Sequence, residues 1–388
     1  MGTPVDHLPN PLEESSIQAL LQSTGLPACS GVTFPKVAAQ YHSIYILSFP
    51  APTLVSSELT VGEDLVLRVS GHHIPKIKTE NEVAVITWIR KNTSIPVPEI
   101  VAYDSSCDNP IGYEYVLMSR VSGTSLDKVY KNLTKYQMSD IIDELVDVLD
   151  QLHSTSWSQI GGLKFGADGT IIPGPVVEET FWHIPDIAKF WGPQETFGNL
   201  NIGGPFDSYV GYVSAHINKY LYAIRRHESL AYMRDMLPRL EMFLDALSRD
   251  AVELNNVKLR LAHKDLHFGN IMYDSQLGKI SAILDWEFSG IVPYTRWNPT
   301  RAFMWNAGET EAGHKESAAL YAEFVARCQV RNAEILDDAE FSSDKQRHMQ
   351  MAANFLRAIV EVSPRGQRKE KVGEWKEQLL EHMSAFAV

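Results

Sequence analysis

The sequence predicts an α+β protein in which a small part built from strands and a helix precedes a larger, mainly helical part. Apolar and polar residues alternate in residues 36–49 and 63–70, and such alternation is typical of half-buried strands. Farther along the chain, apolar residues recur at helical spacing, most clearly in residues 139–152. We therefore predict an N-terminal lobe in residues 1–118 and a C-terminal lobe in residues 119–388.

Length and charge narrow the class of protein. The chain has 388 residues, of which 44% are hydrophobic, and this is enough for one large or two moderate domains. Its formal net charge of −13 argues against a surface that binds nucleic acid or an anionic membrane. The sequence leaves the oligomeric state open.

Cysteine spacing and the absence of long apolar runs bear on the compartment. The three cysteines lie far apart and form no Cys-x-x-Cys motif, which favours free thiols in a reducing compartment. The chain has no unbroken run of eighteen apolar residues, and the first residues lack an apolar signal core. We expect a cytoplasmic location.

The first elements are a short helix and two strands. Residues 1–35 contain one helical pattern, residues 12–22, among several prolines, which predicts an arm and a short helix. Residues 36–49 and 63–70 follow as the two alternating strands, and no glycine stands between Gly31 and Gly62.

A helix and a third strand complete the N-terminal lobe. The helix is expected from Thr79 to Arg90, and in the pattern Thr79-x-x-Glu82 the glutamate can complete a capping box. Residues 92–102 are expected to leave the helix through prolines, and residues 111–119 form a buried strand followed by a turn.

The C-terminal lobe is mostly helical, apart from one long irregular stretch. Residues 157–205 are rich in glycine and proline, and a loop of this length is uncommon unless it is functional or wraps the core. Its four large aromatic residues either fill the core or wall an acceptor pocket, and the sequence leaves both open. Helical spacing recurs in residues 209–226, 233–251, 308–328 and 345–360, and a charged surface helix or linker is expected from Arg365.

Three polar residues meet in the stretch 259–287. An apolar run leads to Asp265, and Asn270 follows it by five residues. Two short strands joined by a glycine-containing turn then place Asn270 and Asp285 at the same open end of a hairpin. A carboxylate here can accept a hydroxyl proton, while an amide oxygen and a second carboxylate suit Mg²⁺.

This stretch carries a family resemblance. His263-Lys264-Asp265 followed by Asn270 resembles the catalytic loop of kinases, and Asp285-Trp286-Glu287 stands where protein kinases have Asp-Phe-Gly. Together the two motifs are most similar to the aminoglycoside phosphotransferase and choline kinase family, over roughly residues 36–305. The structural alternative makes Asp265 a loop cap and Asp285 a strand-end residue.

The resemblance implies a two-lobed protein-kinase-like fold and a chemistry. It implies ATP- and Mg²⁺-dependent phosphorylation of a hydroxyl group on a small molecule. Asp265 would be the catalytic base, and Asn270 and Asp285 would hold the metal. The identity of the acceptor, and ATP rather than GTP, are not fixed by these residues.

The resemblance also assigns residues to the nucleotide. Ala39 and Gln40 stand in the hairpin that covers the phosphates, which in this family is usually rich in glycine. Arg68 takes the place of the strand lysine that holds the phosphates, although Arg and Lys are not equivalent and a surface Arg is the alternative. Met118 and Ser119 fall at the hinge, whose backbone would contact adenine.

Glu82 has a second interpretation under the resemblance. In the family a glutamate six residues before a tryptophan pairs with the strand cation, and Trp88 follows Glu82 by six. One carboxylate cannot fully serve both this pair and a capping box, and we favour pairing with Arg68.

Two other functional classes compete with a small-molecule kinase. A pseudokinase, which binds nucleotide or metabolite without catalysis, would explain the glycine-poor hairpin and Arg68, while the intact Asp265, Asn270 and Asp285 argue against it. A protein kinase fits less well, since the chain has neither Asp-Phe-Gly nor a following Ala-Pro-Glu.

Overall fold

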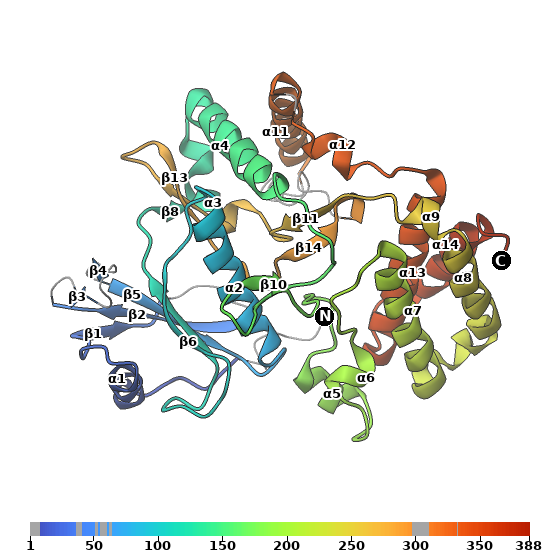
Figure 1. The fold of residues 1–388 in the computed structure, drawn as a ribbon, viewed down its shortest axis with the longest axis horizontal. Coiled ribbons are helices and arrows are strands. Elements are labelled where there is room, and N and C mark those ends of the chain that lie inside the picture. Colours follow the sequence, from blue (N-terminus) through green and yellow to red (C-terminus); the bar gives the residue numbers. More distant parts are fainter. Residues whose placement is uncertain are drawn as a thin grey trace.

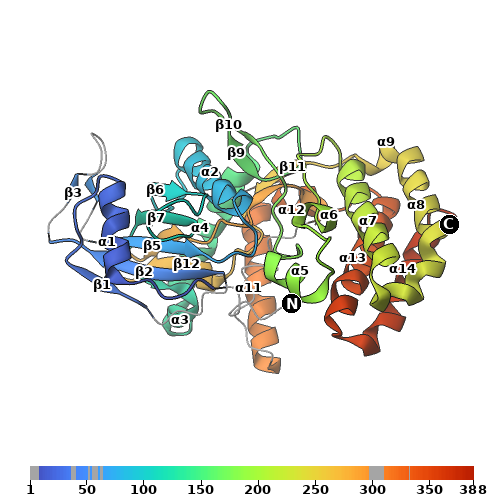
Figure 2. The ribbon, with the colours of Figure 1, turned by 90° about the horizontal axis from the view of Figure 1, so that it is seen from below.

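The structure is a computed structural model, which describes residues 8–35, 41–50, 53–54, 60–61, 64–296, 310–331 and 333–388. It is a mixed α/β fold with a small antiparallel sheet at one end and a group of helices at the other (Figures 1 and 2). Ala39 and Gln40, assigned to the phosphate-covering hairpin, lie outside the described residues.

The N-terminal sheet has five antiparallel strands in the order β1-β2-β5-β7-β6. Helix α1 (Glu14–Ser23) packs against it, and a separate two-stranded pair is formed by β3 (Thr53–Leu54) and β4 (Thr60–Val61). The strands of the sheet are β1 (Gly31–Thr33), β2 (His42–Ser48), β5 (Asp64–Ser70), β6 (Ile100–Asp104) and β7 (Tyr115–Ser119).

Two of these strands differ from the prediction. The sheet begins with β1, where the sequence predicted only an arm, and β6 forms within residues expected to leave the preceding helix. Both are edge strands, and most of their side chains are only partly buried. An edge strand lacks the alternation of a half-buried one, so periodicity alone does not reveal it.

The alternation in the central strand β5 separates the two faces of the sheet. Leu65, Leu67 and Val69 point to one face and pack with the buried side of α1. On the other face, Val116 and Met118 of β7 pack with Val83 of helix α2 (Ile77–Asn92). The sheet is therefore covered by one helix on each side, as expected for a sheet with two apolar faces.

Helix α2 starts two residues earlier than predicted and ends two residues later. Lys76 is its N-cap residue, so Thr79 lies inside the first turn and the capping box predicted at Thr79 and Glu82 does not form. Ten of its residues are buried, because the sheet covers one side and strand β9 (Leu163–Phe165) contacts another. This two-sided burial leaves Glu82 inside the protein.

The remaining elements form the larger, mainly helical part. Its two-stranded sheets are β9 with β10 (Ile171–Pro173) and β11 (Leu259–Ala262) with β14 (Gly290–Pro293). A three-stranded sheet has the order β13-β12-β8, formed by Lys279–Ile283, Ile271–Asp274 and Thr124–Ser125. The helices are α3 (Leu126–Val129), α4 (Lys135–His153), α5 (Ile184–Phe190), α6 (Phe197–Leu200), α7 (Tyr209–Arg226), α8 (Leu237–Arg249), α9 (Ala251–Leu254), α11 (Glu311–Val330), α12 (Ile335–Ala339), α13 (Asp344–Arg365) and α14 (Val372–Ser384), with 3₁₀ turns η2 (Tyr130–Asn132), η3 (Glu228–Met236), η4 (Phe268–Asn270), η5 (Tyr294–Arg296) and η6 (Lys369–Lys371).

Two buried clusters hold this part together. One joins α4 and α11 to the central strands, with Trp286 fully buried in it. The other joins α7, α8, α13 and α14 at the far end (Figure 2). Helix α4 begins four residues earlier than expected, because Thr134 and Gln137 form a capping box before the apolar stripe starts.

The glycine- and proline-rich stretch 157–205 belongs to the core. It contains two short strands and two short helices, and Phe181, Trp182 and Trp191 are buried in the second cluster, with Phe190 packed beside them. Of the two alternatives for these aromatic residues, the structure supports core packing.

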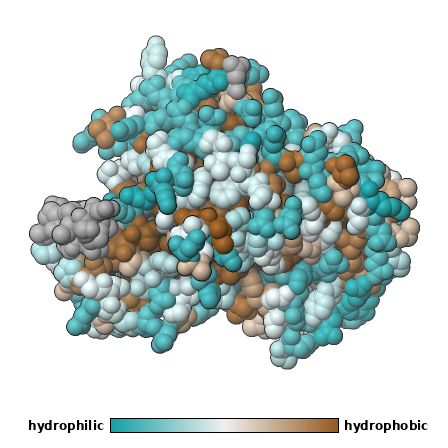
Figure 3. Space-filling view, viewed as in Figure 1, coloured by the Kyte–Doolittle hydropathy of each residue, from teal (hydrophilic) through white to brown (hydrophobic). Residues whose placement is uncertain are grey.

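The surface is mixed in polarity. On the face drawn in Figure 3, hydrophobic residues reach the surface in patches separated by hydrophilic ones. Within the described residues, no helix has both the length and the apolar character needed to cross a membrane.

Asn81 ties α2 to the larger part. Its Nδ2 donates to the backbone carbonyls of Glu287 (3.0 Å) and Ser289 (2.9 Å), and its Oδ1 accepts from the backbone N–H of Leu163 (2.7 Å). All three bonds are buried. This one side chain therefore satisfies three backbone groups that water does not reach.

We predict that Asn81→Ala destabilises the protein by roughly 2–5 kcal/mol, because each unsatisfied buried group costs about 1–3 kcal/mol. Asn92→Ala on the same helix is the matched control. Among the described residues, the Asn92 side chain bonds only to the Trp88 carbonyl of its own helix, and Asn92 is exposed, so we expect a loss under about 1 kcal/mol. Urea unfolding measures the stability of both variants. Equal losses would contradict the role of Asn81 as a clamp between α2 and the larger part.

Candidate active site

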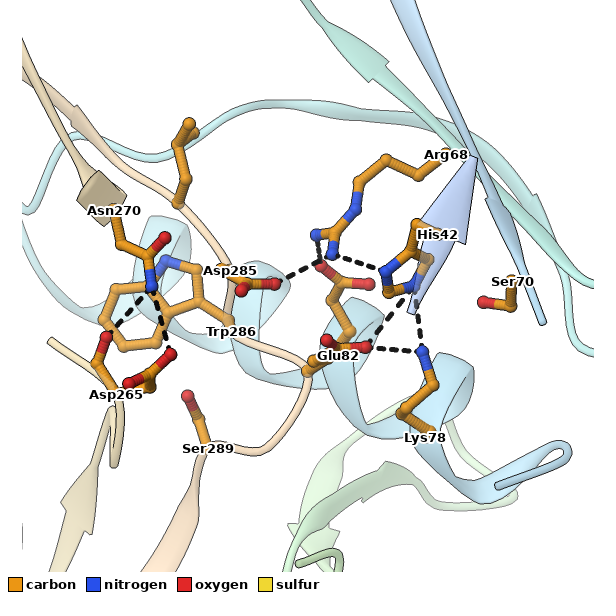
Figure 4. Close-up of polar contacts among 12 residues, drawn as sticks. His42, Arg68, Ser70, Lys78, Glu82, Asp265, Asn270, Asp285, Trp286 and Ser289 are labelled. Atoms are coloured by element: carbon orange, nitrogen blue, oxygen red, sulfur yellow. Dashed lines mark hydrogen bonds and ion pairs between the residues drawn. The ribbon is translucent and has the colours of Figure 1, made fainter. Parts of the chain in front are cut away.

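The central hairpin brings the predicted catalytic residues together. Strands β12 and β13 pair antiparallel, Asn270 directly precedes β12, and Asp285 follows β13 by two residues. The Leu284 N–H donates to the Asn270 carbonyl at 2.8 Å and closes this end of the hairpin. Figure 4 shows Asp285 between Asp265 and Asn270 on one side and Arg68 on the other.

Asp265 and Asn270 are in direct contact. The Asn270 Nδ2 donates to the Asp265 backbone carbonyl at 2.9 Å and lies 3.4 Å from its Oδ2. Because the amide nitrogen faces Asp265, the amide oxygen is left for another partner. The Asp265 side chain is 40% exposed and that of Asp285 is 33% exposed, so both carboxylates can meet a ligand.

His263 and Trp286 connect the loop that carries Asp265 to the end of the hairpin. The His263 ring lies 2.7 Å, at Nε2, from the Leu284 carbonyl, and its Nδ1 accepts from the Asp265 N–H at 3.3 Å. Burial lowers the pKa of His263, so the ring is neutral, with its proton on Nε2. It packs on the Trp286 ring at 4.4 Å between centroids. The two motifs are thus held together by the contacts of His263 with Leu284 and Trp286.

Two residues of the site have left-handed backbones. Lys264 has a φ of 68° and Asp285 a φ of 67°. Side chains other than glycine and asparagine rarely adopt this region, and such strain gathers at functional sites. The loop contacts of His263 and Asn270 hold these conformations in place.

Arg68 faces the predicted catalytic residues from strand β5. Its guanidinium forms a close ion pair with Glu82 through Nη1 and donates from Nη2 to Asp285 Oδ1 at 2.8 Å. Burial alone would lower the pKa of Arg68, but the carboxylates of Glu82 and Asp285 outweigh it and raise that pKa. The guanidinium therefore stays charged. The structure pairs Glu82 with Arg68, as favoured over the capping box.

A second charged pair lies behind the first. Lys78 of α2 forms a buried ion pair with Glu287, the last residue of the Asp285-Trp286-Glu287 motif. His42 stands between the two pairs, with Nδ1 3.0 Å from Arg68 Nη2 and Nε2 2.9 Å from Lys78 Nζ. Arg and charged Lys side chains can only donate hydrogen bonds.

This constraint limits how the His42 ring can bond to its two cationic neighbours. Burial, together with the charges of Arg68 and Lys78, holds the pKa of His42 well below its usual range, so the ring is neutral. A neutral imidazole accepts a hydrogen bond at only one nitrogen, so His42 can accept from Arg68 at Nδ1 or from Lys78 at Nε2, but not from both at once. His42 and Asp285 contact the same nitrogen of the Arg68 guanidinium, Nη2.

The hinge residues have a different environment. Met118 and Ser119 lie at the end of β7, where Met118 pairs with both neighbouring strands. The Ser119 N–H donates to the Glu99 carbonyl at 2.8 Å, and its hydroxyl accepts from the Glu99 N–H at 2.9 Å. The Ser119 N–H is therefore engaged within the sheet, and an adenine contact there remains a prediction.

The sequence missed three residues of the site that have titratable side chains. His42 and Lys78 carried no motif, and Glu287 lay inside a motif whose first residue alone was assigned a role. Glu179 also lies beside the catalytic residues: burial, assisted by the charges of Asp265 and Asp285, raises its pKa, and it accepts a hydrogen bond from Tyr41 at 2.9 Å. A lone charged residue in an irregular stretch gives no sequence signal for such a position.

The donor set fits Mg²⁺ bound together with phosphate. Among the described residues, no group of three or more His, Cys, Asp or Glu side chains forms a metal site. The Asn270 oxygen and the Asp285 carboxylate are hard oxygen donors, and Mg²⁺ commonly takes one or two such ligands and completes its shell with water and phosphate oxygens. These residues suit a metal that arrives with a nucleotide.

Comparison with known families identifies the protein family to which the chain belongs. The model of the phosphotransferase enzyme family matches residues 57–295, which include Arg68, Asp265, Asn270 and Asp285. The chain belongs to this family. The match covers more than half of the chain and both sides of the site just described.

The similar sequences include fungal proteins. A subtelomeric hrmA-associated cluster protein of Aspergillus fumigatus is 25% identical over 261 residues, which are 55% of this chain and 50% of that protein. Clavilactone A biosynthesis cluster protein Y of Ampulloclitocybe clavipes is 25% identical over 316 residues, covering 73% and 67%. The chain spans about half the length of the curated relatives that it matches first.

Solved phosphotransferases share the fold. The gentamicin complex of APH(2'')-IIa aligns over 97% of this chain and 99% of that one, with a TM-score of 0.53 and 11% identity. ADP-bound aminoglycoside phosphotransferase APH(2'')-Ib aligns over the same shares, with a TM-score of 0.53 and 13% identity. These likenesses establish the fold, which is the protein-kinase-like fold expected from the sequence.

We predict that Arg68→Ala and Glu82→Ala are non-additive in the free energy of unfolding, because the two charges are in contact. Residues in contact couple by about 0.5–3 kcal/mol. The control cycle uses Arg234 and Glu228, whose side chains are 40% and 86% exposed, and exposed pairs couple by about 0–1 kcal/mol. Additive losses at Arg68 and Glu82 would show that their contact contributes nothing.

We also predict a pH dependence from His42. Folded His42 stays neutral, whereas an unfolded histidine takes up a proton below a pKa of about 6.5. The unfolded state therefore binds the extra proton, and stability falls by about 1.4 kcal/mol per pH unit as the pH drops below that value.

His42→Gln removes this term and keeps Arg68, Lys78 and Glu287, the charged groups that face the ring. The difference in unfolding free energy between wild type and His42→Gln should therefore change between pH 7.5 and 5 with the slope just given. His314→Gln, at an exposed position of α11, should show no such change. A pH-independent difference for His42→Gln would mean that the folded ring takes up the proton too.

Proposed function

We propose that this protein transfers the γ-phosphoryl group of ATP, with Mg²⁺, to a hydroxyl group of a small molecule. The observation that carries the proposal is the placement of Asp265, Asn270 and Asp285 at one end of the central hairpin, facing the Arg68–Glu82 pair. Membership of the phosphotransferase enzyme family supports it. Phosphoryl transfer needs chiefly positioning and charge stabilisation, and this site offers both.

The nucleotide side has a defined division of roles. Arg68 would contact the phosphates and is held for this by Glu82 and His42. Asn270 and Asp285 would hold Mg²⁺, which neutralises the charge that develops on the phosphate oxygens. Contacts from Ala39, Gln40, Met118 and Ser119 to the nucleotide belong to this proposal as well. ATP- and ADP-containing structures of proteins with this fold are consistent with such a site.

Asp265 would act on the acceptor. Its carboxylate is partly exposed and anchored by Asn270, and no side-chain cation contacts it other than His267, at 3.5 Å, among the described residues. The hydrogen bond to Asp265 raises the pKa of His267. Asp265 would orient the acceptor hydroxyl and accept its proton as the new P–O bond forms.

The relatives point to the type of acceptor. One is named for the biosynthesis cluster of clavilactone A, and another for a gene cluster of Aspergillus fumigatus. We therefore propose a secondary metabolite, or an intermediate of one, as the acceptor. A cytoplasmic location stays a prediction.

A second candidate function is nucleotide or metabolite binding without catalysis. It is favoured by the 2.8 Å bond between Arg68 Nη2 and Asp285 Oδ1, which occupies one oxygen of the carboxylate that a metal would need. ATP binding would have to draw Arg68 towards phosphate and free that oxygen. The retained base, Asp265, has no role in a binder, and for this reason we prefer the kinase.

A nucleotide-binding experiment tests the functional proposal against the alternative that the fold binds no nucleotide. We expect MgATP to raise the melting temperature, and ATP with a chelator to raise it much less, because a ligand stabilises the state that binds it. A folded protein that shows no shift with millimolar MgATP would refute the nucleotide site. A shift without ADP release in a screen of hydroxylated metabolites would support the binder.

We predict that Asp265→Asn lowers acceptor phosphorylation by about 10²–10⁴-fold, the usual contribution of a general base. The variant keeps the side-chain size, so it should fold and show the wild-type melting shift with MgATP. Asp274→Asn, at the far end of β12, is the control and should keep its activity. A full-rate Asp265→Asn enzyme would remove the base assignment, and a loss of the MgATP shift would assign Asp265 to the metal.

A further inference from the structure

His267 stands in the loop between Asp265, the proposed base, and Asn270, a proposed metal ligand. It is the N-cap residue of the 3₁₀ turn η4, which ends on Asn270. Its side chain is 26% exposed and therefore borders the open part of the site. Two contacts, one to the backbone of the turn and one to the base, orient its ring.

The contact with the turn determines which ring nitrogen carries the proton. His267 Nδ1 accepts a hydrogen bond from the Gly269 N–H at 3.0 Å. A ring nitrogen that accepts a hydrogen bond carries no proton, so the proton of this ring is on Nε2. Gly269 makes the contact possible, because a Cβ at this position would lie only 2.7 Å from His267 Cε1.

The contact with the base involves the other ring nitrogen. His267 Nε2 lies 3.5 Å from Asp265 Oδ2, and Asn270 Nδ2, which Figure 4 shows directed at Asp265, lies 3.4 Å from the same oxygen. The hydrogen bond to Asp265 and the charge of its carboxylate raise the pKa of His267. Both distances are long for a hydrogen bond, but contacts of catalytic groups often shorten when substrate binds.

The two donors share one oxygen of Asp265. Among the described residues, no hydrogen bond or ion pair engages Oδ1, the other oxygen of this carboxylate. A carboxylate that is held by two N–H groups on one oxygen turns less freely about its own axis, and its other oxygen keeps a fixed direction. The arrangement therefore distinguishes a held oxygen, Oδ2, from an available one, Oδ1.

We propose that His267 is a positioning residue for the base: together with Asn270 it holds Asp265 Oδ2, so that Oδ1 faces the acceptor hydroxyl. This inference rests on the proposed function, since it concerns the same site and reaction. In the transfer, the acceptor oxygen bonds to the γ-phosphorus, the bond from that phosphorus to the β–γ bridging oxygen of ATP breaks, and the hydroxyl proton passes to Oδ1.

Two substitutions separate the two contacts of the ring. His267→Asn keeps an oxygen near the place of Nδ1, so it can still accept from the Gly269 N–H, but it has no donor that reaches Asp265. His267→Gln places its amide nitrogen near the place of Nε2 and loses the cap. A positioning role predicts that Asn is the worse substitution for turnover, whereas a purely structural role predicts that Gln is.

The turnover is measured as ADP release from MgATP by the full chain, with water or an acceptor found in the metabolite screen. We expect His267→Asn to lower kcat by about 10- to 100-fold, as for a small misplacement of a catalytic group, with the KM for MgATP unchanged. His267→Gln should keep most of the wild-type kcat, while its melting temperature falls because the cap is lost.

His227 offers a matched control. It is likewise an N-cap residue, and its Nδ1 accepts at 3.2 Å from the N–H two residues farther on, that of Ser229. Its Nε2 lies 2.9 Å from the Phe190 carbonyl and so serves a different part of the molecule. His227→Asn should therefore keep the wild-type kcat.

The inference is overturned if folded His267→Asn turns over like wild type, or if His267→Gln is the slower of the two variants at saturating MgATP. Failure of the proposed function looks different, since the wild type itself would then show no melting shift with MgATP or release no ADP with water and every metabolite, and the inference would fall with it. Melting temperatures confirm that the variants are folded.

Discussion

The guanidinium of Arg68 is the charge on which the site depends. It is almost fully buried and stands between Glu82 of α2 and Asp285 of the central hairpin, so it joins three elements that are far apart in the sequence. A buried cation is stable only when it is paired, and removing one partner leaves the other as an uncompensated charge. The position of α2, the direction of Arg68 and the conformation of the Asp285 loop are therefore determined together. Lys78 and Glu287 form a second buried ion pair behind the first. His42 contacts both Arg68 and Lys78 and so connects the two pairs.

The site combines rigid support with accessible functional groups. His263 and Trp286 lock the loop beneath Asp265, while Asp265 and Asp285 keep a third or more of their side chains exposed. The left-handed backbones of Lys264 and Asp285 are strained, and this strain is the energetic cost of holding the two carboxylates in position. Glu178 and Glu179 come from an irregular stretch: Glu178 pairs with Arg296, and burial together with the charges of Asp265 and Asp285 raises the pKa of Glu179.

Local patterns in the sequence predicted the hairpin and its three polar residues, because strand alternation, a turn and fixed spacing act over short distances. The Arg68–Glu82 pair could be predicted from the sequence only through a family resemblance. Sequence failed where burial is decided by tertiary packing: Lys78 looks like a surface residue of a helix, yet its side chain is fully enclosed and paired with Glu287. Edge strand β6 and the start of α4 were missed or misplaced because exposed strands and helix caps carry little apolar periodicity.

The Asn81 clamp has a consequence for motion. In proteins of two lobes, one lobe can rotate relative to the other about a hinge. The element that stays attached to a lobe during this rotation sets the rotation axis. Because Asn81 and Lys78 fasten α2 to residues 287–289 and to β9, this helix is expected to travel with the larger, helical part. Among the described residues, Arg68 of β5 and His42 of β2 link the sheet across the same boundary through side chains of the site. We therefore expect any rocking of the sheet to pivot on a stationary α2 and to change the contacts that Arg68 and His42 make across this boundary.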